Sequence, residues 1–421
     1  IFLYDGKTGE KLHELVSVDQ HHTGGIFSVA WSPDSSRLLT SSADSTVKIW
    51  DVQAQSVVRT FDLSTAAATP DTQQVGNLWQ GDHLLSLALS GEINYLDPNS
   101  GEVARTVKGH QKAITALTIG APSSATFFTG SYDGRAHAWH YGRDADRAVA
   151  EPLKGDGHAN QITAMAIAGD AVFSAGMDDV VKFASVEKVG ATTVPTGSQP
   201  RYVSASPSGT LVVATIDNVQ AYDRTGHRLA TLSNPGFNPT AVAITPDAQT
   251  VIVGGDDNRS RAYRLADGAL TLLPDLELAS NRGAITALAV SPQGTHLAAG
   301  DAQGKIFVYD LGTGEVVVTQ WVFHSARVNS LAWSANGKFV VSGSLDTNVF
   351  VWNLDNPGKR VQIKKAHIAG VNGVGWAGER EVVSVGQDAT VKVWEVVLPH
   401  GVFIKQYRIG SEPEEKNKYV Q

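Results

Sequence analysis

The sequence contains no cysteine among its 421 residues. This absence excludes disulfide bridges, thiolate zinc sites and cysteine nucleophiles. No run of about 18 apolar residues occurs, so we expect no membrane insertion. Positive charge is also scarce. The 34 Lys and Arg residues are outnumbered by 42 Asp and Glu, and the net charge of −8 makes nucleic acid an unfavourable partner.

The familiar motifs of enzymes and cofactor sites are missing as well. Gly6-Lys7-Thr8 resembles the end of a phosphate-binding loop, but Ile1 stands where that loop needs its first glycine. We interpret the segment as a hairpin turn. No zincin His pair, calcium loop or nucleophile elbow is present. We therefore predict a protein that is not an enzyme and that holds neither a metal nor a cofactor.

The main positive feature is an internal repeat with a period of about 40 to 45 residues, which is typical of propeller blades. The clearest copy begins at His22 and continues through an apolar strand at 26–31 and a Ser-Pro-Asp turn. A second strand at 37–41 follows, and the copy ends with a third strand that closes on Trp50-Asp51. Apolar residues are continuous enough in these strands to indicate sheets that are buried on both faces.

Further copies follow this first one, and some lack the His. They begin at His110, His158, His324 and His367, while 75–97, 201–223, 240–265 and 284–310 follow the same plan without it. This gives nine repeats, preceded by the last strand of a tenth at Ile1–Tyr4. Because the chain opens inside a strand, we expect that residues preceding it are missing.

Nine repeats exceed the four to eight or so blades of one closed ring, so the fold class that we predict is all-β, with WD-repeat propellers in tandem. Residues 1–105 would be the C-terminal part of a first, incomplete propeller with exposed blade faces. Residues 106–397 would form a complete seven-bladed propeller, and 398–421 a C-terminal extension. The outer strand of the last blade could come from 402–404, from 102–107 or from missing N-terminal residues.

The well-formed repeats combine a His, an Asp and a Trp, with the Asp six residues before the Trp in four of them. An Asp at a tight turn can accept hydrogen bonds from backbone N–H groups and from the His, and the Trp N–H is a further donor. We interpret these sets as buried networks that lock each blade, because a catalytic site would not recur once per blade. The predicted network residues are His22, Asp44, Trp50, His110, Asp133, Trp139, His158, Asp178, His324, Asp346, Trp352, His367, Asp388 and Trp394.

Three repeats depart from the pattern, since Ala184, Tyr263 and Tyr309 stand where the Trp is expected. We expect those blades to depend on packing instead. The candidate protein-binding residues come from loops of the first propeller and from the one Trp without a place in the repeat. They are His21, Thr23, Gln74, Gln80 and Trp321.

The motifs that distinguish this chain from a generic repeat protein occur in a fixed order. They include Trp31-Ser32-Pro33-Asp34-Ser35, Lys48-Ile49-Trp50-Asp51-Val52, Leu78-Trp79, Ile93-Asn94-Tyr95-Leu96-Asp97, Met177-Asp178-Asp179 and Asn234-Pro235-Gly236. In this order the sequence resembles the actin-interacting protein 1 family up to about Val397. The resemblance implies a tandem protein of fourteen blades, of which this chain corresponds to the last nine.

The same resemblance implies a function. Members of the family bind actin filaments decorated by cofilin, promote their severing and disassembly, and limit barbed-end regrowth. The expected partners are therefore actin filaments and cofilin, in the cytoplasmic actin cytoskeleton. The first four repeats and most of a fifth are absent, and the family's actin-contacting surface lies largely there, so few contact residues can be transferred. The alternative is a WD-repeat scaffold in another complex.

Overall fold

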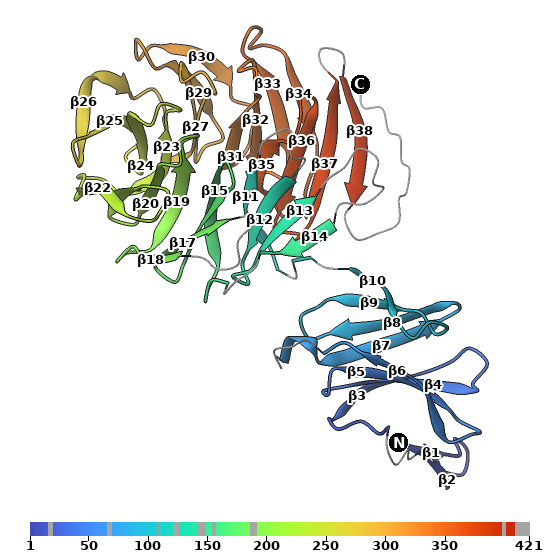
Figure 1. Cartoon of the computed structure of the whole chain (residues 1–421). Coiled ribbons are helices and arrows are strands. Elements are labelled where there is room, and N and C mark those ends of the chain that lie inside the picture. Colours follow the sequence, from blue (N-terminus) through green and yellow to red (C-terminus); the bar gives the residue numbers. More distant parts are fainter. Residues whose placement is uncertain are drawn as a thin grey trace. The chain divides into compact units, whose positions relative to one another are not determined.

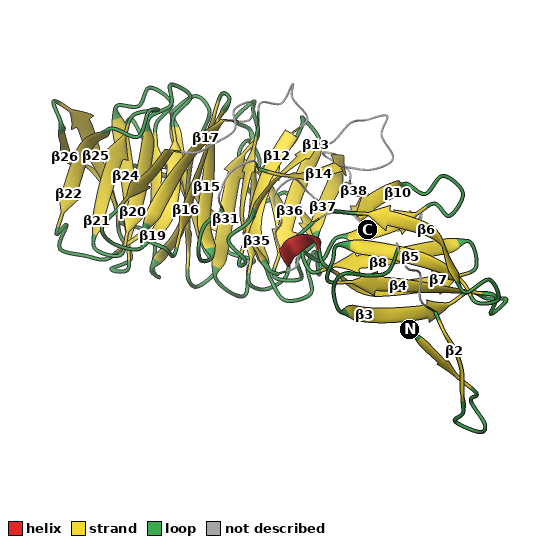
Figure 2. Cartoon of the chain, turned by 60° about the horizontal axis from the view of Figure 1, so that its bottom comes forward, coloured by secondary structure: helices red, strands yellow, loops and turns green. Residues whose placement is uncertain are grey.

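The computed structural model describes residues 1–15, 20–64, 70–107, 109–110, 112–120, 126–140, 149–153, 157–185, 192–397 and 401–408. These residues form two compact units, 1–109 and 110–421 by their limits in the chain. Strands dominate both units (Figure 2), and one short 3-10 helix, η1 (Pro70–Thr72), is the only helix among the described residues. None of these residues forms a helix with the length and hydrophobicity of a membrane span.

Unit 1 contains two four-stranded antiparallel sheets and one two-stranded hairpin. Its strands are β1 (Phe2–Tyr4), β2 (Lys11–Glu14), β3 (Ile26–Trp31), β4 (Arg37–Ser42), β5 (Thr46–Asp51), β6 (Ser56–Asp62), β7 (Gln74–Gln80), β8 (His83–Ala88), β9 (Ile93–Leu96) and β10 (Val103–Val107). The repeat before the first complete one therefore contributes two strands, where the sequence predicted one. Lys7 and Thr8 donate backbone hydrogen bonds to Asp5 Oδ1 in the turn between β1 and β2, as expected for a hairpin.

Unit 2 contains seven four-stranded antiparallel sheets, each built from four consecutive strands (Figure 1). We number them blades 1 to 7. Their strands are β11 (Ile114–Ile119), β12 (Thr126–Ser131), β13 (Ala136–His140) and β14 (Val149–Pro152); β15 (Ile162–Ala168), β16 (Ala171–Gly176), β17 (Val180–Ser185) and β18 (Thr192–Pro195); β19 (Pro200–Ala205), β20 (Leu211–Thr215), β21 (Asn218–Tyr222) and β22 (Arg228–Ser233); β23 (Pro239–Ile244), β24 (Thr250–Gly255), β25 (Ser260–Ala266) and β26 (Ala269–Leu278); β27 (Ile285–Val290), β28 (His296–Asp301), β29 (Ile306–Asp310) and β30 (Val316–Trp321); β31 (Val328–Trp333), β32 (Phe339–Ser344), β33 (Val349–Asn353) and β34 (Arg360–Ile363); and β35 (Val371–Trp376), β36 (Glu381–Gly386), β37 (Val391–Val397) and β38 (Gly401–Arg408).

The seven blades close into a ring, because blade 7 packs against blade 1 as well as blade 6. Phe127 and Trp139 of blade 1 share a buried cluster with Val383 and Val393 of blade 7. Glycine permits the close approach of the inner strands at this junction. A Cβ on Gly375 would lie 2.4 Å from Ile119 Cγ1, which is too close for any side chain. The structure is therefore one complete seven-bladed propeller preceded by the blades of unit 1.

Polar side chains join successive inner strands around much of this ring. The second residue of an inner strand donates a hydrogen bond to a backbone oxygen at the start of the next inner strand. The pairs are Thr115 with Ile162, Thr163 with Pro200, Thr286 with Val328, Asn329 with Val371, and Asn372 with Ile114. Each of these five acceptors lies next to the register shift at the start of its inner strand, so the bonds satisfy backbone groups at that irregularity.

The outer strand of blade 7 comes from the C-terminal region. β38 pairs antiparallel with β37, in a register that places Phe403 opposite Glu395. Residues 102–107 do not supply this strand, since β10 (103–107) pairs with β9 in unit 1. The predicted boundary at 105/106 thus cuts through β10, and the compact units divide after Gly109 instead. Of the three possible sources of this strand, the structure shows the one at 402–404, and the strand extends over 401–408.

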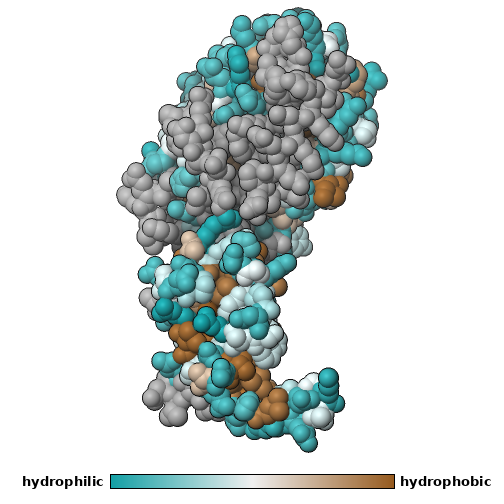
Figure 3. Space-filling view, turned by 90° about the vertical axis from the view of Figure 1, so that its right-hand side faces the viewer, coloured by the Kyte–Doolittle hydropathy of each residue, from teal (hydrophilic) through white to brown (hydrophobic). Residues whose placement is uncertain are grey.

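Hydrophobic side chains are exposed on two sheets of unit 1, and Figure 3 shows brown groups on the surface of this unit. On β3, Phe27, Val29 and Trp31 are each about half exposed, and on the other four-stranded sheet Leu78 and Leu87 are 46% and 40% exposed. Between the two sheets the hydrophobic side chains form a buried cluster, in which Leu39 and Phe61 pack with Leu84. The unit therefore has a buried interior between its two sheets and exposed apolar side chains on both of them.

Candidate functional site

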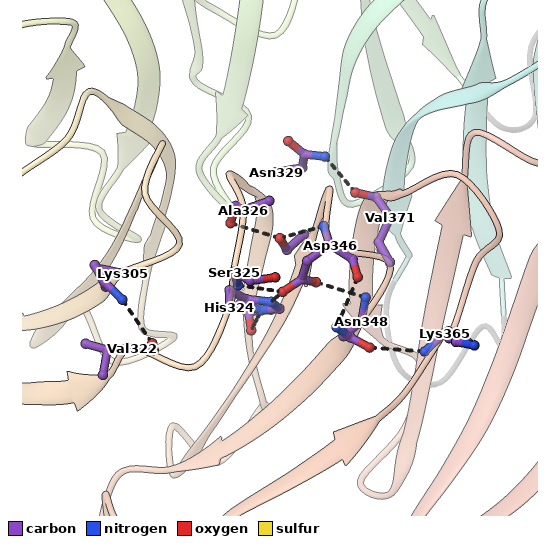
Figure 4. A network of polar contacts seen from close by, with 12 residues as sticks. Lys305, Val322, His324, Ser325, Ala326, Asn329, Asp346, Asn348, Lys365 and Val371 are labelled. Carbon is purple, nitrogen blue, oxygen red and sulfur yellow. Dashed lines mark hydrogen bonds and ion pairs between the residues drawn. The ribbon is translucent and has the colours of Figure 1, made fainter.

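The His, Asp and Trp residues of the repeat meet through a hydroxyl group that the sequence analysis did not include. In blade 6, His324 Nδ1 lies 2.9 Å from Asp346 Oδ2 (Figure 4). His324 Nε2 lies 2.8 Å from Ser342 Oγ. Trp352 Nε1 donates to the same hydroxyl at 2.8 Å. With the proton on Nδ1, every polar group of this network has a hydrogen-bond partner. Ser342 accepts from the Trp and donates to Nε2, and the imidazole donates to Asp346.

Blade 7 and the first complete sheet of unit 1 repeat this geometry. His367 contacts Asp388 Oδ1 at 2.8 Å and Ser384 at 2.9 Å, and Trp394 donates to Ser384. The corresponding set on β3–β6 is His22, Asp44, Thr40 and Trp50. In every set the hydroxyl residue precedes the Trp by ten positions. That constant spacing is the signal by which the sequence could have identified it.

The Asp carboxylates also fix the backbone of the loop that carries the His. Thr23, Ser325 and Ile368 each donate a backbone N–H to the Asp of their own set, at 2.9 to 3.1 Å. Burial alone would raise the pKa of Asp388, but hydrogen bonds from Thr390 and His367 lower it to about 2. For His367, burial is the main cause of a pKa below the usual value. The His367–Asp388 pair is therefore a neutral imidazole beside a carboxylate.

Blade 1 departs from the prediction. His110 Nε2 and Trp139 Nε1 both contact Thr129 Oγ1, at 2.7 and 2.6 Å. Among the described residues, however, buried His110 Nδ1 has no hydrogen-bond partner, and Asp133 accepts the backbone N–H of Arg135 instead. The imidazole of His137 packs edge-on against His110, with ring centroids 4.3 Å apart. The predicted His110–Asp133 contact is thus wrong, and burial and the neighbouring His137 lower the pKa of His110 to about 3.

Two blades without the Trp still contain polar networks. In blade 2, His158 contacts Asp178 at 2.8 Å and Ser174 at 2.9 Å, and only the Trp donor is missing. In blade 5, Tyr309 donates to Asn281 Oδ1 at 2.9 Å, and Asn281 Nδ2 lies 3.4 Å from Asp301. These two blades therefore lack the full network, and each keeps part of it beside its packing. Sequence reasoning missed blade 5 because its Asp stands two positions before Gln303 and an Asn replaces the His.

The candidate protein-binding residues fall into two groups. His21, Thr23 and Gln80 are exposed. Gln74 and Trp321 are 1% and 0% exposed, so the structure contradicts their assignment as surface anchors. Gln74 lies beside Asn94, and the distance from Asn94 Nδ2 to Gln74 Oε1 is 3.5 Å. The indole of Trp321 stacks on Trp352, with centroids 5.4 Å apart.

The described residues contain no group of three His, Asp or Glu side chains placed to bind a metal ion. Each His–Asp contact lies inside its own blade and is built into its packing. Loops and rims on rigid scaffolds bind other molecules through a few anchoring side chains.

Comparison with known proteins agrees with this architecture. The family model described as WD domain, G-beta repeat matches residues 12–51, 101–140, 275–310, 315–353 and 358–395. Together with the ring of four-stranded sheets, the match makes this chain a WD-repeat β-propeller protein.

Its relatives define the family more closely. WD repeat-containing protein 1 of Gallus gallus is 38% identical over 334 residues, which are 78% of this chain and 53% of the relative. Actin-interacting protein 1 of Drosophila melanogaster is 37% identical over 334 residues, with the same coverage. The 66 kDa stress protein of Physarum polycephalum is 38% identical over 333 residues. The chain belongs to the actin-interacting protein 1 family, and it spans about half the length of these curated relatives.

Proposed function

We propose that the protein binds actin filaments, promotes their cofilin-dependent severing and disassembly, and limits barbed-end regrowth. The observation that supports this most strongly is the match over 334 residues to a relative named actin-interacting protein 1. Its setting would be the cytoplasmic actin cytoskeleton, and its partners actin filaments and cofilin. Binding would use loops on rigid blades, without covalent chemistry, cofactor or metal.

The loop before β3 is the part of unit 1 best suited to this role. His22 is fixed by Asp44, and the N–H of Thr23 donates to the same carboxylate at 2.9 Å. The backbone of the loop is therefore held in place while the side chains of His21 and Thr23 stay exposed. A loop that is ordered before binding loses less conformational entropy when it meets a partner. Gln80, at the end of β7, is a third exposed candidate on the same unit.

Co-sedimentation with actin filaments, alone and decorated with cofilin, tests the proposal. We expect the chain to pellet when cofilin is present, and the triple variant H21A/T23A/Q80A to pellet less. The matched control is H140A/T313A/Q249A, which removes exposed residues of the same types from unit 2. If the chain does not pellet with cofilin-decorated filaments, the proposal fails for this chain. A pull-down would then test the alternative of a scaffold in another complex.

A further inference from the structure

Exposed apolar side chains are concentrated at one end of the unit 2 ring. Among its described residues, ten large apolar side chains are exposed: Tyr132, Met177, Ile216, Leu229, Leu272, Val317, Val322, Phe323, Leu345 and Ile368. Three of them lie on outer strands. The other seven lie at the end of the ring where the inner strands begin, in loops or in turns after the second strand of a blade. None lies in the turns of the opposite end.

Four of these side chains occupy the same structural position in different blades. Tyr132, Met177, Ile216 and Leu345 each follow the second strand, and each donates its N–H to the carbonyl of the residue before the inner strand of its own blade. We call the seven equivalent positions the mouth ring. Blade 4 places Asp256 there, and the other two positions hold Ala302 and Gln387. The apolar members of blades 1, 2 and 3 are consecutive, and the acidic residue of blade 4 comes directly after them.

A cavity of about 470 Å³ lies where the apolar members give way to the acidic one. Asp217, which follows Ile216 in the chain, lines it together with Phe237, Asp256 and Asp257. Asp257 is paired with Arg261 at 2.6 Å. Asp217 and Asp256 accept hydrogen bonds from Ser, Thr and Asn groups, but within the described part of the chain neither is paired with a Lys or Arg side chain. The cavity therefore keeps a negative charge that a cationic group would neutralise.

The chain's own Arg261 shows how such a group can be held. Its guanidinium makes two hydrogen bonds to Asp257 and lies 4.2 Å from the ring centroid of Phe237, and both partners line the cavity. Planar guanidinium groups suit this combination of carboxylate and aromatic face. Asp217 and Asp256 offer further carboxylates in the same space. A guanidinium or ammonium group from outside thus finds complementary charge there.

We propose that the mouth ring is a docking surface for a polypeptide segment that inserts an Arg or Lys side chain between Asp217 and Asp256. An adjacent aliphatic or aromatic side chain of the same segment rests on Met177 and Ile216. The partner is a protein, since the surface joins an apolar arc to a cation-binding cavity. The docking surface belongs to unit 2, and this proposal is independent of the actin proposal, which concerns loops of unit 1.

A random display library of twelve-residue peptides, selected against the full chain, tests this docking surface. We expect the enriched peptides to contain a basic residue next to a large apolar one. Labelled copies of these peptides should bind I216S and D256N at least about tenfold more weakly, and more weakly at high salt, as expected for charge pairing. The controls L272S and D275N change exposed residues of related types on β26 and should leave the affinity unchanged.

Failure to enrich any peptide, enrichment of acidic peptides, or unchanged affinity in I216S and D256N would each overturn the docking proposal. The same variants are then compared in the cofilin-dependent pelleting assay. Retained pelleting with lost peptide binding would show that the two surfaces act separately. If the unmodified chain does not pellet with cofilin-decorated filaments, that result would instead count against the actin proposal alone.

Discussion

Asn372 donates a hydrogen bond from Nδ2 to the backbone oxygen of Ile114 over 2.7 Å, although 258 positions separate the two residues. This bond joins the inner strands of blades 7 and 1, where the ring closes. We predict that N372A weakens the closure by about 1 kcal/mol, the usual net value of one hydrogen bond. Hydrogen exchange should become faster in β11 and β35 together. N356A, in an exposed turn of blade 6, is the control, and equal protection in both variants would contradict the prediction.

Ser342 is the hub of the blade 6 network, because both Trp352 Nε1 and His324 Nε2 contact its hydroxyl at 2.8 Å. S342A leaves two buried groups without a partner, and we expect it to cost about 1–3 kcal/mol for each. S174A in blade 2 is a matched comparison, since in the described part of the chain the Ser174 hydroxyl has a hydrogen bond to His158 and none to a Trp. Urea unfolding should show a larger loss of stability for S342A than for S174A. Equal losses would mean that the Trp contact contributes nothing.

The strands and most His–Asp pairs could be predicted from sequence, because they depend on spacings that repeat from blade to blade. Trp321 could not be placed, because its burial depends on Trp352 in the next blade and not on its own strand. His110 also escaped prediction. Its motif is intact, but His137 packs against the imidazole and Asp133 makes no hydrogen bond to it. Exposure of the candidate loop residues likewise depends on three-dimensional packing, which separates buried Gln74 from exposed Gln80.

His110 should make stability depend on pH. Burial, aided by His137, lowers its pKa to about 3 in the folded protein. The unfolded chain protonates it near the ordinary value of about 6.5. The stability that neutral His110 contributes to the fold is therefore fully present above pH 6.5. It is lost as the pH falls from about 6.5 to 3, and the free energy of unfolding falls by about 1.4 kcal/mol per pH unit. H110N should reduce the slope of stability against pH in that window, whereas exposed His140 serves as the control in H140N. An unchanged slope in H110N would contradict this account.

Trp321 should behave as a core residue. Its indole is fully buried and stacks on Trp352 at an interplanar angle of 20°. We expect W321A to destabilise unit 2 by about 3–5 kcal/mol, the usual cost of removing a large buried aromatic side chain. V317A, at a half-exposed position of the same strand, should change stability little. The free energy of unfolding in urea measures both. A W321A variant as stable as V317A would mean that the indole is not buried in solution.

β38 should be part of the stable propeller, because it forms the outer strand of blade 7 through pairing with β37. Truncation after Val397 removes it and leaves β37, with its buried Val393 and Trp394, at the edge of the sheet. We expect the melting temperature of unit 2 to fall by several degrees, because backbone hydrogen bonds are lost and the side chains of β37 become less protected. Truncation after Arg408 retains β38 and is the control. If both truncated proteins melt at the same temperature in differential scanning calorimetry, β38 does not stabilise the ring.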